Sequence, residues 1–169
     1  MAIREILEYP DPRLREVAAP VEAVTDEIRQ LVEDMAETMY AAPGCGLAAT
    51  QIGVMKRIFV IDVAGEDEPS DLRVFINCEI LELDGVQTWN EGCLSFPGLS
   101  EEIKRAERVK VRALGLDGEP FELEADGLMA VAIQHENDHL NGVLMIDKVN
   151  ALKRRAIGRK MAKKQAARA

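Results

Sequence analysis

The two histidines of this chain, His135 and His139, are four residues apart, and Glu136 lies between them. Residues at this spacing share one face of an α-helix, so both imidazoles can reach a single metal ion. In a His-Glu-x-x-His pattern the glutamate lies close to the metal without binding it, where a general base for water must be. The pattern predicts a hydrolytic metal site. The alternative is a core helix with two hydrogen-bonded histidines.

A helix around this pattern is expected on independent grounds. Asp126 can cap its start, and Gly142 can end its last turn. Leu128, Val131 and Ala132 fall on the same face as the two histidines. An imidazole among apolar groups must be coordinated or hydrogen-bonded, and the full pattern on a buried face favours coordination.

A catalytic site of this kind needs a third protein ligand. Downstream of His139 the chain has no histidine, glutamate or cysteine, and Asp147 is the only acidic residue there. The third ligand is therefore Asp147 or an upstream residue, for which a cysteine is the natural candidate. Cys93 is favoured over Cys45 and Cys78, because the glycine before it lets the backbone approach the metal. Its thiolate would complete a Cys-His-His set with a fourth position open for water.

The overall composition excludes several classes of protein. Acidic residues number 30 against 21 basic ones, so general binding to DNA or other nucleic acids is not expected. No apolar run approaches the length that spans a membrane, and the first residues lack the apolar core of a signal peptide. Three irregularly spaced cysteines favour a reducing, cytoplasmic location. A single domain over residues 1–169 is expected.

The elements that position these residues follow from the hydrophobic pattern. A helix is predicted over residues 26–40, capped by Thr25. Its predicted buried stripe is Ile28, Leu31, Val32, Met35 and Met39. Strands are predicted over residues 57–63, 72–77 and 79–83, and a hairpin over residues 108–125.

The C-terminal segment, residues 148–169, contains nine basic residues and no acidic one. Leu152, Ala156, Ile157 and Met161 recur at helical spacing, which predicts a basic amphipathic helix on an acidic body. Together these elements indicate an α+β fold. We expect a mainly antiparallel sheet packed around the central metal-binding helix, with an N-terminal helix and this C-terminal basic helix.

Three motifs make the chain similar to the bacterial peptide deformylases. They are GCGLAATQ at residues 44–51, EGCLS at residues 91–95 and QHENDHLNG at residues 134–142, and YPDPRLR at residues 9–15 is similar too. The resemblance covers nearly the whole chain. It implies a hydrolase that removes the formyl group from the N-terminal formylmethionine of newly synthesised proteins and releases formate.

The resemblance also implies a metal and a set of residue roles. One divalent metal, usually Fe(II) and replaceable by Zn(II), Ni(II) or Co(II), would be held by Cys93, His135 and His139. Glu136 would transfer the proton, while the Gln51 side-chain amide and the Leu94 backbone N–H would stabilise the charge on the carbonyl oxygen. The implied substrate-binding residues are Gly46, Trp89, Leu128, Val131 and Ala132. Ser100 and Cys45 depart from the usual pattern, in which an arginine and an aliphatic residue are more common.

The implied partners are formylmethionyl nascent peptides and the ribosome. The C-terminal helix resembles the one that docks on ribosomal RNA near the peptide exit in this family. A solvated helix whose lysines interact with the acidic domain is the alternative.

Two other functions are weighed against a deformylase. A zinc peptidase that cuts internal bonds is disfavoured by the missing downstream ligand. An inert ribosome-binding module is disfavoured by the intact Cys93, His135, Glu136 and His139. Release of formate distinguishes the deformylase from both.

Overall fold

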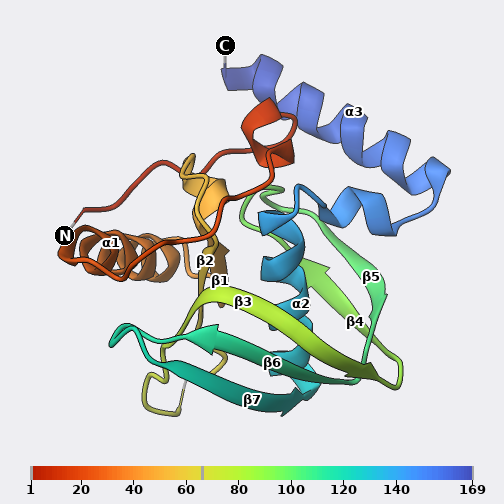
Figure 1. Ribbon diagram of the computed structural model, residues 1–169. Coiled ribbons are helices and arrows are strands. Elements are labelled where there is room, and N and C mark those ends of the chain that lie inside the picture. The colour runs from red at the N-terminus through yellow and green to blue at the C-terminus, as the bar shows by residue number, and fades with distance from the viewer. Residues whose placement is uncertain (1, 66, 169) are drawn as a thin grey trace.

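Two antiparallel sheets and three α-helices make up the computed structural model, which describes residues 2–65 and 67–168 (Figure 1). The larger sheet has the strand order β1 (Gly46–Ala48), β2 (Ile58–Ile61), β3 (Arg73–Asp84), β6 (Arg108–Leu114) and β7 (Pro120–Asp126). The smaller sheet pairs β4 (Gln87–Gly92) with β5 (Ser100–Arg105). The helices are α1 (Asp26–Ala41), α2 (Gly127–Leu140) and α3 (Ala151–Arg168), with 3-10 turns at Pro12–Arg15, Ala49–Ile52 and Met145–Lys148. The predicted α+β fold is confirmed.

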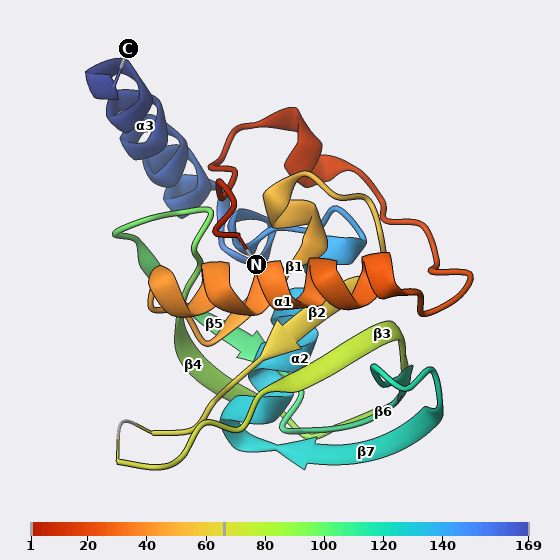
Figure 2. The same cartoon turned by 90° about the vertical axis from the view of Figure 1, so that its left-hand side faces the viewer.

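Strand β2 is buried on both faces because a helix packs against each of them. Ile58 and Val60 lie in the cluster that holds the apolar stripe of α1. Phe59 and Ile61 lie in the cluster that holds Ile133 of α2. Successive side chains of a strand point to opposite faces, so the sheet separates α1 from α2. Figure 2 shows α1 on the outer side of this sheet, with α2 on the inner side between the two sheets.

The first helix forms where the sequence predicts it and extends one residue further, to Ala41. The Thr25 hydroxyl accepts a hydrogen bond from the Ile28 backbone N–H at 3.3 Å, which caps the start. All five residues of the predicted stripe are buried. Burial of this face against β1 and β2 stabilises both the helix and the strands that it covers.

The hairpin predicted over residues 108–125 is confirmed as β6 and β7. Val109 pairs with Ala125 and Val111 pairs with Leu123, so the apolar residues of both strands share one face. The two strands predicted over residues 72–77 and 79–83 are one strand, β3, so the predicted break was wrong. Asn77 has a φ of 54°, and the register with β6 shifts beside it, so the strand continues through a bulge.

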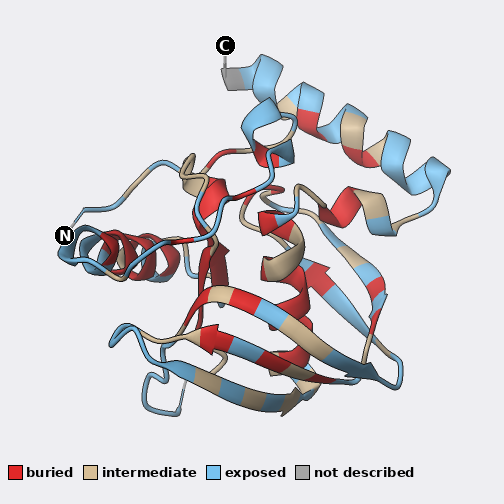
Figure 3. Ribbon diagram, in the orientation of Figure 1, coloured by how far each residue is buried: buried red, intermediate tan, exposed pale blue. Residues whose placement is uncertain are grey.

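Two details of the predicted helices were also wrong. Asp126 occupies the N-cap position of α2, but its side chain makes no capping hydrogen bond. In α3, Ile157 and Met161 are buried, whereas Leu152 is 68% exposed and lies outside the apolar face. Figure 3 shows this narrow buried stripe on a helix that is otherwise mostly exposed, with a few half-buried positions. None of the helices in the described part of the chain is long and apolar enough to cross a membrane.

Candidate metal centre

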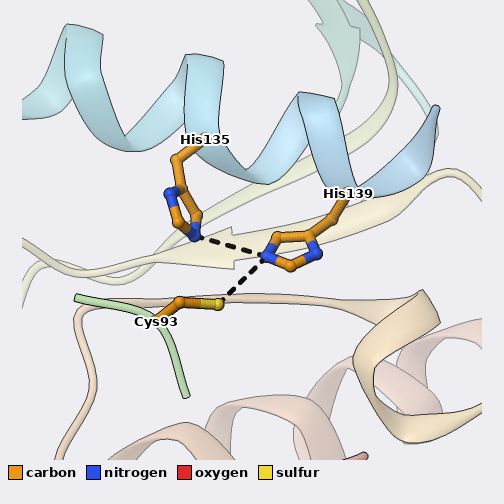
Figure 4. A group of neighbouring side chains, drawn as sticks. All are labelled: Cys93, His135 and His139. Carbon is orange, nitrogen blue, oxygen red and sulfur yellow. Dashed lines mark hydrogen bonds between the residues drawn. The ribbon is translucent and has the colours of Figure 1, made fainter. Parts of the chain in front are cut away.

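His135 and His139 project from one face of α2 toward Cys93, which directly follows β4 (Figure 4). The Sγ atom of Cys93 lies 3.3 Å from Nε2 of His139. The same Nε2 lies 3.3 Å from Nε2 of His135. All three donor atoms lie within 4.8 Å of one another. The structure therefore brings together the three residues that the sequence suggested as metal ligands.

The spacing of these atoms fits one metal ion. Metal–nitrogen bonds of about 2.0 Å and metal–sulfur bonds of about 2.3 Å in a tetrahedral site separate the donor atoms by about 3.3 to 3.6 Å. A thiolate and two imidazoles form a donor set that Zn(II), Fe(II), Co(II) and Ni(II) accept. Among the described residues, this is the only group of histidine, cysteine and carboxylate side chains with such spacing.

The other residues considered as third ligands lie elsewhere. Asp147 forms an ion pair with Arg15, whose Nη2 lies 3.0 Å from Oδ1 of Asp147. Cys78 is buried in the core between the sheet and α2. Cys45 is exposed and lines the cavity described below without joining the cluster.

The two histidines differ in their surroundings. His139 is 1% exposed, and its pKa lies well below the ordinary value because burial and the neighbouring His135 both oppose a positive charge. Burial also acts to lower the pKa of His135. Hydrogen bonds with Cys93 and Glu91 outweigh burial, so the pKa of His135 is raised well above the ordinary value. His139 is therefore neutral at neutral pH, the form in which an imidazole binds a metal.

Glu136 has the features of a proton-transfer group. Its side chain is buried, and its Oε1 atom has no hydrogen-bond partner among the described residues. Burial raises the pKa of Glu136 to about 7, and the charges of His135 and Arg105 oppose this rise. Its carboxyl group lies beside Gly46 of β1.

A cavity of about 550 Å³ opens beside the metal cluster. Cys93, His135 and Glu136 form one part of its wall. The other predicted site residues that line it are Gly46, Gln51, Leu94, Leu128, Val131 and Ala132. The predicted catalytic residues and the predicted apolar pocket residues Leu128, Val131 and Ala132 therefore line the same cavity.

The Gln51 side chain is buried at the edge of this cavity. Its Oε1 accepts the Ala48 backbone N–H at 2.9 Å. Its Nε2 donates to Ser95 Oγ at 3.0 Å and lies 3.7 Å from Cys93 Sγ. The amide group is therefore oriented toward the cysteine loop. The Leu94 backbone N–H donates no hydrogen bond within the described part of the chain.

Trp89 lies apart from the other predicted pocket residues. It is not among the described residues that line the cavity, and it is 38% exposed. Its Nε1–H donates to Gln87 Oε1 at 2.7 Å. Ser100 lies across the β4–β5 pair, where its Oγ accepts a hydrogen bond from Asn90 at 3.3 Å.

Sequence reasoning missed the contacts that Glu91 and Arg105 make in this site. Oε1 of Glu91 lies 2.9 Å from Nδ1 of His135, and Arg105 holds the same carboxylate through two hydrogen bonds. The signal that could have found them is a pair of opposite charges on neighbouring strands. That signal could not be read because neither β4 nor β5 was predicted.

A Cys-His-His cluster with two buried histidines, a buried carboxylate with one oxygen unpartnered among the described residues, and an adjoining cavity are together the features of a metal-dependent hydrolase. The family model for polypeptide deformylase matches residues 3–155. The chain is 58% identical over 163 residues to the peptide deformylase of Alkalilimnicola ehrlichii, across 96% of this chain and 91% of that relative. The crystal structure of a peptide deformylase from Legionella pneumophila matches with a TM-score of 0.92 and 46% identity, covering 99% and 98% of the two chains.

The peptide deformylase of Ehrlichia chaffeensis, solved in complex with actinonin, matches with a TM-score of 0.93 and 39% identity, across 97% of this chain and 98% of that chain. The chain belongs to the polypeptide deformylase family. The predicted family and activity are confirmed: this is a metal-dependent hydrolase that removes the N-formyl group from newly synthesised proteins.

Proposed function

We propose that Cys93, His135 and His139 hold the divalent metal of this deformylase and that Glu136 transfers the proton during formyl hydrolysis. The observation that carries this assignment is the convergence of three donor atoms within 4.8 Å of one another. Two of the three residues, Cys93 and His135, line the cavity that Glu136 also lines. No other described group of side chains offers such a donor set.

When bound, the metal would activate the attacking water and polarise the formyl carbonyl. Glu136 is the group that accepts the proton of the water. It lines the cavity beside the metal cluster, and its Oε1 has no hydrogen-bond partner among the described residues. The protonated carboxyl group then donates to the departing amine. One residue thus serves as base and then as acid within a single turnover.

Two hydrogen-bond donors near Cys93, the Leu94 backbone N–H and the Gln51 side-chain amide, would stabilise the negative charge that develops on the carbonyl oxygen. The Leu94 backbone N–H has no partner among the described residues, so it is free to donate to the carbonyl oxygen. The Gln51 amide is held by its bond from the Ala48 backbone N–H, which fixes the orientation of the N–H groups. A fixed donor stabilises the transition state without reorganising during the reaction.

The methionine side chain of the substrate is proposed to occupy the apolar part of the cavity. Leu128, Val131 and Ala132 line this part beside His135, and a flexible thioether suits an irregular apolar wall. β1 is an edge strand that pairs with β2 on one side, so the backbone at Gly46 can bind the peptide as an added strand. Trp89 is left out of this pocket because it does not line the cavity.

We further propose Fe(II) as the native metal. The donor set also accepts Zn(II), Ni(II) and Co(II), so the proposal of iron rests on the resemblance of the three motifs. A thiolate ligand is open to oxidation, and the iron form should lose activity in air faster than a zinc or nickel form. Elemental analysis of protein purified without oxygen tests the identity of the metal.

The proposed cellular partner is the ribosome, and the proposed location is the cytoplasm, where formylated nascent chains emerge. Arg155, Arg159, Lys160 and Lys163 are exposed on α3. This face carries positive charge on an otherwise acidic protein, which favours contact with RNA phosphates. Residues 1–169 are proposed to form one domain, because Ile157 and Met161 pack with Phe96 in a shared core cluster.

The decisive assay uses protein purified without oxygen and a short peptide with an N-terminal formylmethionine. We expect release of formate together with one new amino terminus for each formate. A peptidase that cuts internal bonds would instead release peptide fragments from formylated and unformylated substrates alike. An inert ribosome-binding module would release neither product.

A further inference from the structure

His135 has a carboxylate partner on the side of its ring that faces away from the metal cluster. Its Nδ1 lies 2.9 Å from Oε1 of Glu91. A carboxylate accepts hydrogen bonds, so the imidazole must carry its proton on Nδ1. In the neutral form that binds a metal, the Nε2 lone pair then points toward the metal cluster, where Nε2 lies 3.3 Å from His139 Nε2. Glu91 therefore selects the tautomer that a metal ligand needs.

Glu91 is itself held by a buried arginine from the neighbouring strand. Nε of Arg105 donates to Oε2 of Glu91 at 2.6 Å, and Nη2 donates to Oε1 at 2.9 Å. The side chains of Arg105 and Glu91 are only 4% and 5% exposed. Two parallel hydrogen bonds fix the plane of the carboxylate as well as its position.

Arg105 is in turn connected to the helix that carries the histidines. Its Nη1 donates to Oδ2 of Asp138 at 2.8 Å, and Asp138 also lies 3.8 Å from Nζ of Lys148. The chain of contacts thus leaves α2 at His135, crosses β4 and β5, and returns to α2 at Asp138. It connects the smaller sheet to the turn of α2 that carries His135 and Asp138.

The second histidine has no such support. Nδ1 of His139 is buried and has no hydrogen-bond partner among the described residues. Within the described part of the chain, a carboxylate orients the imidazole of His135 and none orients that of His139. The contribution of this contact to metal binding can therefore be tested at a single ligand.

We propose that Glu91, held in place by Arg105, is a positioning residue that fixes the tautomer and ring orientation of His135 and thereby raises the affinity for the metal. This inference rests on the proposed function, since it requires His135 to be a ligand. Removal of a carboxylate behind a metal-binding histidine typically weakens metal binding about 10- to 100-fold. Both carboxylate oxygens of Glu91 are engaged by His135 and Arg105, so we assign it a positioning role and not a catalytic one.

The competing explanation is that these charged groups only stabilise the fold. Asp34 provides a matched comparison, because it is also a buried carboxylate that accepts two hydrogen bonds from one arginine, Arg4. Asp34 lies on α1, which packs on the other face of the sheet. Loss of either carboxylate should lower stability, but only loss of Glu91 should change the metal site.

The experiment measures the Zn(II) dissociation constant of the full chain by competition with a chelator, at a temperature where all variants are folded. Glu91→Gln should raise this constant about 10- to 100-fold, whereas Asp34→Asn should change it less than about twofold. Asp138→Asn, three contacts away from His135, should have a smaller effect than Glu91→Gln. The visible absorption of the Co(II) form should change in Glu91→Gln and not in Asp34→Asn.

Arg105→Lys serves as a second variant if Glu91→Gln does not fold. It keeps the positive charge but loses the paired hydrogen bonds, so it should also weaken zinc binding. Wild-type affinity in folded Glu91→Gln or Arg105→Lys would overturn the inference. Failure of the wild-type chain to bind zinc at all would instead overturn the proposed function.

Discussion

Glu136 lies against Gly46 so closely that a Cβ atom on Gly46 would be 2.6 Å from Oε2 of Glu136. No side chain fits there without moving the carboxylate. Gly46 does not have a positive φ, so the glycine is required by space and not by backbone conformation.

We predict that Gly46→Ala displaces Glu136 and lowers kcat. A displacement of about 1 Å can reduce the rate about 10²-fold, while the metal donors remain in place. Gly158→Ala is the control, because nothing lies within 4 Å of a Cβ there. Turnover and metal content of both variants are the measurements. Wild-type turnover in Gly46→Ala would show that the position of Glu136 tolerates change.

Glu136→Gln tests the proton transfer itself. The amide keeps the size of the side chain but cannot accept the proton of the water. We expect the metal content to be retained and kcat to fall by a factor of at least about 10², the usual contribution of a positioned acid or base. Substantial turnover by metal-loaded Glu136→Gln would remove Glu136 from the mechanism.

Asp34 gives a pH-dependent contribution to stability. Hydrogen bonds from Arg4 are the largest cause that lowers the pKa of Asp34, and burial opposes them. A carboxyl group whose pKa is lowered in the folded state stabilises the fold above its unfolded pKa of about 3.9. This stabilisation is lost as the pH falls through the folded pKa.

We therefore predict that Asp34→Asn lowers the free energy of unfolding by about 1 to 3 kcal/mol at neutral pH. The difference from wild type should begin to shrink below about pH 4, where the carboxyl group protonates in the unfolded state, and should disappear as the pH falls through the lower folded pKa. Urea unfolding of both metal-free proteins over a series of pH values is the measurement. A difference that stays constant in acid would contradict the assigned ion pair.

The basic face of α3 is tested by neutralising charges and not by truncation. Ile157 and Met161 are part of the core cluster that contains Phe96, so removing the helix would also expose that cluster. The test variant replaces four exposed residues with glutamine, namely Arg155, Arg159, Lys160 and Lys163. It should keep turnover of a short peptide but lose salt-sensitive binding to ribosomes.

A control with the same change in net charge comes from the sheet region. It replaces Lys104, Arg108, Lys110 and Arg112 with glutamine, none of which lines the cavity beside the metal cluster. The control should bind ribosomes like wild type. Equal binding by the two variants would mean that α3 is not the contact surface.

The helices and the hairpin could be predicted because their signals are local. Thr25 caps α1 through an atom three residues away, and β6 and β7 are joined by a short turn. The two histidine ligands could be predicted for the same reason. Their spacing of four residues on one helix places both rings on the same face.

Other features depend on contacts between distant residues. Strands β4 and β5 contain few alternating apolar residues, so they have no periodic signal. The contacts of Glu91 with His135 and of Arg105 with Glu91 form only when these two strands lie beside α2. For the same reason the sequence could not show that Trp89 lies outside the cavity wall. A side chain's neighbours across two unpredicted strands cannot be derived from its position in the sequence.

The central claim is that Cys93 is the third metal ligand. The most direct test is elemental analysis of Cys93→Ser, Cys45→Ser and Cys78→Ser after purification without oxygen. Cys93→Ser should lose most of its metal, because only two strong donors would remain. Cys45→Ser and Cys78→Ser should retain the wild-type metal content. Full metal occupancy in Cys93→Ser would contradict the proposed site.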